Sequence, residues 1–144
     1  MAEKKYKIGY TTGVFDMFHI GHLNILKRAK EQCEYLIVGV STDELVQSYK
    51  HKNPVIKFEE RCAIVGAIKY VDKVVAQTSL DKMEAYKAQK FDVMFHGSDW
   101  KGSDMYDKIV KEFALVGVDV VFLPHTDGIS STLIREKANK ACKE

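Results

Sequence analysis

The segment Tyr35-Leu36-Ile37-Val38-Gly39-Val40 is almost continuously apolar. A run of this length is typical of a strand that is buried on both faces of a parallel sheet, because a strand with one wet face would alternate. Amphipathic stretches flank it, since apolar residues recur at helical spacing along His22–Glu31 and again along Phe58–Tyr70. The centre of the chain therefore predicts helix, strand and helix in succession.

The same alternation extends toward both ends of the chain. Further strands are predicted at Tyr6–Tyr10, Asp72–Ala76, Asp92–His96 and Val118–Leu123, and further helices at Asp81–Lys90, Asp104–Leu115 and Ser130–Lys140. A basic, irregular segment is expected at Tyr49–Pro54. Strands joined through helices form right-handed crossovers, so we predict an α/β fold with a doubly wound, five-stranded parallel sheet. With no repeat or linker-like segment, residues 1–144 are expected to form one domain.

Composition narrows the function classes. The formal net charge of +2 is too small to predict a nucleic-acid or membrane surface, and no apolar run approaches the length that spans a bilayer. The first residues lead into a strand, which is unlike a signal peptide. Cys33, Cys62 and Cys142 are odd in number and far apart, which is typical of reduced thiols. We therefore expect a cytoplasmic protein.

Ligands of such sheets bind at the carboxyl ends of the strands, where the strand order reverses. Four predicted loops lie there and hold most of the unusual polar residues: Gly13–His22, Ser41–Lys52, Gly97–Trp100 and His125–Thr132. This coincidence predicts a binding site at that edge of the sheet.

The first of these loops reads Gly13-Val14-Phe15-Asp16-Met17-Phe18-His19-Ile20-Gly21-His22. Gly13 allows a ligand to approach the backbone, and Gly21 is expected to leave the surface between the histidines open. His19 and His22 point the same way on a helical first turn. Beside free helix N–H groups they form an anion site that suits a triphosphate. Two ordinary surface histidines, or a zinc site without a third ligand, remain alternatives.

The last loop repeats this chemistry. Gly128 allows a tight turn, and Ser130 and Ser131 are good N-cap residues for the final helix. Their hydroxyls and the free N–H groups can hold phosphate oxygens. A plain helix cap explains the same residues without a ligand.

Both loops resemble motifs of one enzyme family. Gly13–His22 resembles the His-x-Gly-His motif of the nucleotidyltransferase superfamily, and its surroundings resemble the cytidylyltransferases within it. His125-Thr126-Asp127-Gly128-Ile129-Ser130-Ser131-Thr132 is similar to the Arg-Thr-Glu-Gly-Ile-Ser-Thr-Thr/Ser block of glycerol-3-phosphate and choline-phosphate cytidylyltransferases. The resemblance covers nearly the whole chain. It implies a Rossmann-like fold and an enzyme that transfers CMP from CTP to a small phosphate monoester and releases pyrophosphate.

The resemblance also implies catalytic roles for His19, His22, Lys50 and Arg61. Lys50 matches the family's mobile lysine, with Lys52 as the alternative, and Arg61 matches an arginine that helps to hold the acceptor or the triphosphate. From the residues alone, the lysines could belong to a solvated loop, and Arg61 could form a surface ion pair with a glutamate.

Nucleotide contacts are implied for Gly13, Val14, Phe15, Asp16, Gly21, Asp99, Trp100, His125, Thr126, Gly128, Ile129, Ser130, Ser131 and Thr132. The segment Gly97–Gly102 resembles a Gly-Asp-Asp-Trp segment whose second aspartate helps to read cytosine, since a carboxylate accepts from its exocyclic amine. The role of Asp16 stays open between the acceptor, a metal and the fold of the first loop.

Two departures from the family bear on the substrate. Val14 stands where the glycerol-3-phosphate branch has threonine, and His125 stands where the relatives have arginine. We place glycerol 3-phosphate first as the acceptor. Choline or ethanolamine phosphate, an adenylyltransferase on the same fold, and a nucleotide-binding regulatory domain without turnover are the alternatives. We further expect Mg²⁺ bound with CTP, no metal site made by the protein and no nucleic-acid partner. The resemblance implies a homodimer formed near the first motif and the helix containing Arg61.

Overall fold

The computed structural model describes residues 5–97, 103–124, 126 and 129–143. Its strands are β1 (Tyr6–Gly13), β2 (Cys33–Ser41), β3 (Lys73–Gln77), β4 (Val93–Gly97) and β5 (Asp119–Leu123). Its helices are α1 (Ile20–Gln32), α2 (Asp43–Lys50), α3 (Phe58–Gly66), α4 (Lys82–Gln89), α5 (Asp104–Ala114) and α6 (Ser131–Lys143).

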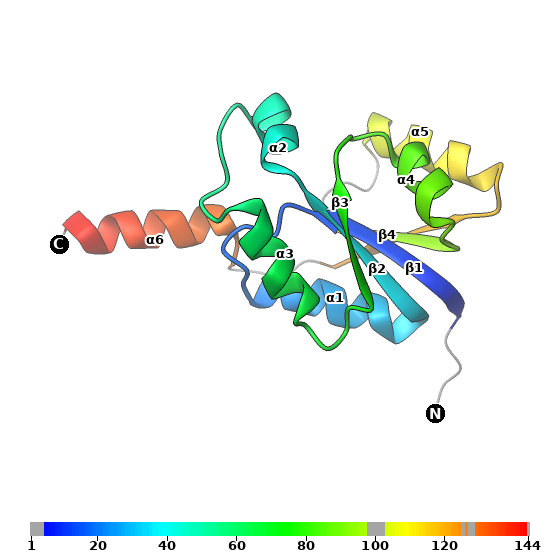
Figure 1. The fold of residues 1–144 in the computed structure, drawn as a ribbon, viewed down its shortest axis with the longest axis horizontal. Coiled ribbons are helices and arrows are strands. Elements are labelled where there is room, and N and C mark those ends of the chain that lie inside the picture. The colour runs from blue at the N-terminus through cyan, green and yellow to red at the C-terminus, as the bar shows by residue number, and fades with distance from the viewer. Residues whose placement is uncertain (1–4, 98–102, 125, 127–128, 144) are drawn as a thin grey trace.

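The five strands form one parallel sheet in the order β3-β2-β1-β4-β5 (Figure 1). The chain steps outward from β1 to β3 and then crosses to β4 on the other side of β1. The strand order therefore reverses between β1 and β4, which is where such sheets bind ligands. The predicted doubly wound, Rossmann-like architecture is confirmed.

The alternation of side chains along β2 explains why its buried part, Leu36–Val40, is apolar at every position. Leu36, Val38 and Val40 point into a core shared with α1 and α3, whereas Ile37 points into a second core shared with α4 and α5. Figure 1 shows the two helix pairs on opposite sides of the sheet. Because successive residues of a strand face opposite sides, a strand covered on both faces requires apolar residues at every position.

One helix was not predicted. Helix α2 occupies most of the segment expected to be a loop after the second strand. The Thr42 side chain accepts a hydrogen bond from the Leu45 N–H at 3.1 Å and caps the helix, which ends at His51 in a left-handed conformation (φ 56°). The helix has only eight residues, of which Leu45 and Val46 are buried, so its apolar periodicity is too short to recognise.

Some boundaries also differ from the prediction. Strand β1 continues to Gly13, beyond its predicted end at Tyr10, because its last residues pair with β2 up to Val40. Helix α3 ends at Gly66 rather than at Tyr70. None of the helices in the described ranges is long and apolar enough to cross a membrane.

Candidate active site

A pair of histidines caps helix α1. His19 is the N-cap residue, and its Nδ1 accepts a hydrogen bond from the Gly21 N–H at 3.1 Å. In return, the His19 N–H donates to Nδ1 of His22 at 3.1 Å. Because Nδ1 accepts in both rings, a neutral ring must carry its proton on Nε2. Each histidine is therefore fixed as an Nε2–H donor.

The surroundings of His22 keep it uncharged. Its ring stacks on that of His19 at 3.8 Å between centroids, and the rings of Phe15 and Phe18 lie 5.4 and 5.2 Å away. Burial lowers the pKa of His22 to about 4, with a smaller lowering from His19 and an opposing effect of Asp16. Burial also lowers the pKa of His19. Near neutral pH the pair therefore offers hydrogen-bond donors rather than cations.

The two glycines of this loop are needed for close packing. A Cβ at Gly21 would lie 2.9 Å from Cε1 of His19, so the His19 ring covers the position that we expected to be open. A Cβ at Gly13 would lie 3.0 Å from the Phe15 ring. Phe15 itself has a left-handed backbone (φ 55°), which is unusual for a bulky residue and is held by burial of its ring.

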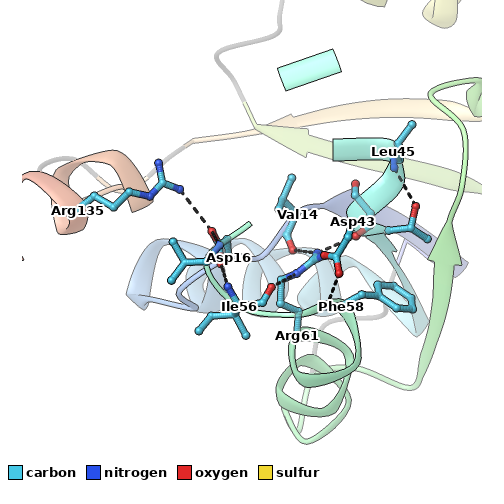
Figure 2. Close-up of polar contacts among 11 residues, drawn as sticks. Val14, Asp16, Asp43, Leu45, Ile56, Phe58, Arg61 and Arg135 are labelled. Carbon is cyan, nitrogen blue, oxygen red and sulfur yellow. Dashed lines mark hydrogen bonds and ion pairs between the residues drawn. The ribbon is translucent and has the colours of Figure 1, made fainter. Parts of the chain in front are cut away.

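Asp16 connects three segments of the chain (Figure 2). Its carboxylate accepts hydrogen bonds from the N–H groups of Val55 at 2.8 Å and Ile56 at 2.9 Å, and it pairs with Arg135 of α6 at 3.4 Å. Its carbonyl oxygen accepts from the Ser131 hydroxyl at 2.6 Å. The carboxylate is 5% exposed and both of its oxygens are bonded. Of the roles left open for Asp16, these contacts support the one in the fold of the first loop.

Arg61 is buried rather than exposed, so the surface ion pair considered above is wrong. Its guanidinium donates to the carbonyl oxygens of Ile56 at 2.9 Å, Val14 at 2.7 Å and Ser41 at 2.7 Å, and it pairs with Asp43 at 2.5 Å (Figure 2). All three of its nitrogens are thereby engaged. Val14 and Ser41 lie at the carboxyl ends of β1 and β2, so Arg61 connects the two strand ends beside the site. None of its nitrogens is left to bind a ligand.

Next to the histidines lies a cavity of about 240 Å³, here called the basic pocket. It is lined by Val14, Phe15, Asp16, His22, Val46, Lys50, Lys52, Asn53, Pro54, Ser131, Thr132 and Arg135. The structure thus brings the first motif and the start of α6 into one cleft together with three cationic side chains. The pKa of Lys50 is lowered by burial and by its neighbours Lys52 and Arg135. Such mutual repulsion would be relieved by a bound anion.

The segment between β5 and α6 is held against α1. The Asn24 side chain donates to the Thr126 hydroxyl at 2.8 Å, and Arg28 donates to the Pro124 carbonyl at 2.9 Å. The Ser130 hydroxyl caps α6 by accepting from the Leu133 N–H at 3.1 Å. Ile129, another predicted contact, lies beside Gly21. The predicted residues Asp99, Trp100, His125 and Gly128 lie outside the described residues.

A second cavity of about 450 Å³, here called the strand-end pocket, adjoins the basic pocket. It is lined by Thr12, Gly13, Val14, Ser41, Tyr49, Lys50, Gln77, Leu80, Lys82, His96, Met105 and Tyr106. Val14 and Lys50 line both cavities. Lys50 therefore lies at the junction between them, at the end of α2 rather than in the loop where it was expected.

Two cationic residues that line these cavities, Arg135 and Lys82, were not predicted from the sequence. Arg135 lies one helical turn after Ser131, so the spacing of the last helix could have indicated it. Lys82 is a single lysine in the first turn of α4, and no motif surrounds it. For metals, no group of three His, Cys, Asp or Glu side chains in the described part of the chain could hold an ion.

Residues 10–137 match the family model described as cytidylyltransferase-like, and the chain belongs to this family of nucleotidyltransferases. It is 37% identical over 128 residues to glycerol-3-phosphate cytidylyltransferase of Bacillus subtilis (strain 168), which covers 88% of this chain and 93% of that enzyme. It is 36% identical to the enzyme of the same name from Staphylococcus aureus (strain NCTC 8325 / PS 47), over 88% of this chain and 91% of the relative.

More distant similarities agree with this family. A probable ethanolamine-phosphate cytidylyltransferase of Encephalitozoon cuniculi (strain GB-M1) is 36% identical over 74% of this chain and 33% of its own length. The solved lipopolysaccharide core biosynthesis protein of Thermoplasma volcanium GSS1 superposes with a TM-score of 0.71 at 26% identity, over 84% of this chain and 97% of the neighbour.

The buried histidines make stability depend on pH. The folded state keeps His22 and His96 neutral, with pKa values lowered to about 4 mainly by burial, while the unfolded chain protonates them near 6.5. The free energy of unfolding should therefore fall as the pH drops below 6.5, by about 1 kcal/mol per histidine one unit lower. Urea unfolding at pH 6.5 and one pH unit lower measures this loss in the free energy of unfolding. Replacing both with asparagine should flatten the dependence, and the exposed-site control His51→Asn should not.

Arg61→Lys tests whether the guanidinium is structural. Lysine cannot reach three carbonyls and a carboxylate at once, so we expect a loss of about 3 kcal/mol in the free energy of unfolding. Arg28→Lys, which affects one hydrogen bond at the surface, is the matched control and should cost less than about 1 kcal/mol. An Arg61→Lys protein with full stability but no turnover would instead support the direct substrate role that the family resemblance implied.

Proposed function

We propose that this protein transfers CMP from CTP to a small phosphate monoester, with glycerol 3-phosphate as the first candidate, and releases pyrophosphate. The observation that carries the proposal is the basic pocket, in which His22, three cationic side chains and the first turn of α6 line one cavity. The relatives named as glycerol-3-phosphate cytidylyltransferases support the choice of substrates.

The basic pocket suits the triphosphate of CTP. Lys50, Lys52 and Arg135 supply positive charge, and the N–H groups at the start of α6 favour an anion. The neutral histidines would donate from Nε2 to oxygens of the α-phosphate, where charge increases during the reaction. Asp99 and Trp100, with the loop around His125 and Gly128, would contact the rest of the nucleotide.

The acceptor would occupy the strand-end pocket, and its phosphate would meet the α-phosphate beside Lys50. One acceptor oxygen forms a bond to the α-phosphorus in line with the departing oxygen, and the bond to that oxygen breaks as pyrophosphate leaves. No covalent intermediate with the protein is needed. Catalysis would come from positioning two anions and offsetting their charge, as in other phosphoryl and nucleotidyl transfers.

Arg61 and Asp16 would act as positioning residues in this reaction. Both are fully bonded within the protein, and together they hold the loops that carry the histidines and Lys50. Mg²⁺ would neutralise charge on the triphosphate. Phosphate oxygens are ligands that Mg²⁺ prefers, so the ion would bind together with CTP.

A cytoplasmic homodimer completes the proposal. Ile20 at the start of α1, Val55 beside Asp16 and Ile64 of α3 are 53%, 58% and 44% exposed. They lie near the first motif and on α3, where the family resemblance implies contact with a second copy, and dimerisation would remove apolar surface from water.

A pyrophosphate-release assay tests the reaction and its substrates together. CTP and ATP are each paired, in the presence of Mg²⁺, with glycerol 3-phosphate, ethanolamine phosphate and choline phosphate. We expect turnover with CTP and glycerol 3-phosphate above all other pairs. His22→Ala and His19→Ala should lower turnover by orders of magnitude, roughly 10²-fold or more, because two positioned donors are lost.

Three results would change the proposal. Preference for ATP would indicate an adenylyltransferase. Binding of CTP without pyrophosphate release from any acceptor would indicate a regulatory domain. Normal turnover in both histidine variants would refute the role of the imidazole pair.

A further inference from the structure

One side of helix α1 carries two contacts to the segment between β5 and α6. Asn24 and Arg28 are four residues apart and therefore lie on the same side of the helix. Arg28 donates to the carbonyl oxygen of Pro124 at 2.9 Å, and this bond to the backbone already attaches the segment to the helix. Asn24 donates to the hydroxyl of Thr126 at 2.8 Å, a bond between two side chains. The second bond therefore calls for a role beyond attachment.

The direction of the bond between Asn24 and Thr126 fixes what the hydroxyl can do. A threonine hydroxyl has one proton and two lone pairs. Because Nδ2 of Asn24 is the donor, Oγ1 of Thr126 accepts through a lone pair and keeps its own proton. In the described part of the chain, that proton is donated to no other group. The amide thus leaves the hydroxyl as a donor that points away from Asn24.

This arrangement repeats the logic of the histidine pair. In both cases a bond inside the protein occupies an acceptor atom, and the remaining proton becomes a neutral donor of fixed direction. Asn24 and Thr126 are both partly buried, so water competes less with their bond. Donors that are oriented in advance stabilise negatively charged oxygens without the cost of reorganisation.

Thr126 lies at the same edge of the sheet as the basic pocket. It follows the carboxyl end of β5 and precedes Ser131, which begins α6 and lines that pocket. The family resemblance implies a nucleotide contact for Thr126. In the sequence its neighbour is His125, where the relatives have arginine, so this segment has less fixed charge and depends more on hydrogen-bond donors.

We propose that Asn24 is a positioning residue for the nucleotide: its amide orients the Thr126 hydroxyl so that the hydroxyl proton is donated to an oxygen of bound CTP. The oxygen belongs to a phosphate or to the ribose. This inference rests on the proposed binding of CTP, and it adds a residue of α1 that none of the sequence motifs includes.

The affinity of the full chain for CTP tests the proposal. Isothermal titration with CTP and Mg²⁺ is carried out without an acceptor, so that the nucleotide is bound and not consumed. Asn24→Asp should raise the Kd about tenfold, because a carboxylate only accepts and would take the proton of the Thr126 hydroxyl. Asn24→Ala lets the hydroxyl rotate and should raise the Kd only about threefold. If Asn24 merely held the segment in place, alanine would be the more harmful substitution, since aspartate keeps a bond to Thr126.

A double-mutant cycle separates this effect from simple repulsion between aspartate and the triphosphate. Thr126→Val should itself raise the Kd about tenfold, and Asn24→Asp should add less than about twofold in the Thr126→Val protein. Thr126→Ser keeps the hydroxyl and should bind CTP like the wild type. Gln32→Glu makes the same change from amide to carboxylate at the other end of α1, and it should leave the Kd unchanged.

Titration with 2′-deoxy-CTP identifies the oxygen that receives the proton. If a phosphate receives it, Asn24→Asp should weaken both nucleotides by the same factor. If the 2′-hydroxyl receives it, the substitution should weaken CTP alone. Either result supports a donor at Thr126 that Asn24 orients.

Four results would overturn the inference: a Kd for CTP that Asn24→Asp leaves unchanged, a larger loss for Asn24→Ala, a loss that persists fully in the Thr126→Val protein, or a wild type that does not bind CTP. If Asn24→Asp does not fold by circular dichroism, the cycle with Asn24→Ala decides, because its effect should vanish with Thr126→Val. Affinity that depends on Asn24 as described, without pyrophosphate release from any acceptor, would refute the proposed reaction and leave this inference standing.

Discussion

Two buried side chains of opposite charge, Asp16 and Arg61, hold the edge of the sheet on which the site is built. They meet at Ile56, whose N–H donates to Asp16 and whose carbonyl accepts from Arg61. Asp16 extends this connection to α6, and Arg61 extends it to the ends of β1 and β2. A buried ion is tolerated only when its hydrogen bonds are satisfied, and here each partner is a backbone group or an opposite charge. The network therefore specifies one arrangement of the loops around the basic pocket.

In the site that this network holds, different residues supply the positive charge and the neutral hydrogen-bond donors. The reciprocal cap of α1 uses Nδ1 of both histidines, which leaves Nε2–H as a neutral donor on each. Positive charge comes instead from Lys50, Lys52 and Arg135. This division suits transfer between two anions, because the donors are fixed in place while the lysine side chains can adjust as charge moves. It also explains why burial of His22 is compatible with function.

The fold could be predicted from the sequence, because extended runs of Val and Ile, such as that of β2, indicate the buried strands of a parallel sheet. The sequence did not predict helix α2, because its few buried residues show no helical spacing. For the site, the two loop motifs indicated that His22 and Ser131 belong together, and both line the basic pocket. The burial of Arg61 left no trace in the sequence, since most of its partners are backbone carbonyls that any residue provides. Lys82 could not be recognised for a related reason, because only the packing of α4 against β1 brings it to Thr12.

We propose that the histidine pair and the start of α6 bind the same triphosphate. A crystal structure of the protein with a CTP analogue that cannot be cleaved between the α- and β-phosphates tests it most directly. We expect α-phosphate oxygens within hydrogen-bonding distance of Nε2 of His22, and the other phosphates at Lys50 or Lys52 and the first turn of α6. A triphosphate bound outside the basic pocket, with His22 and Ser131 free of contact, would contradict it.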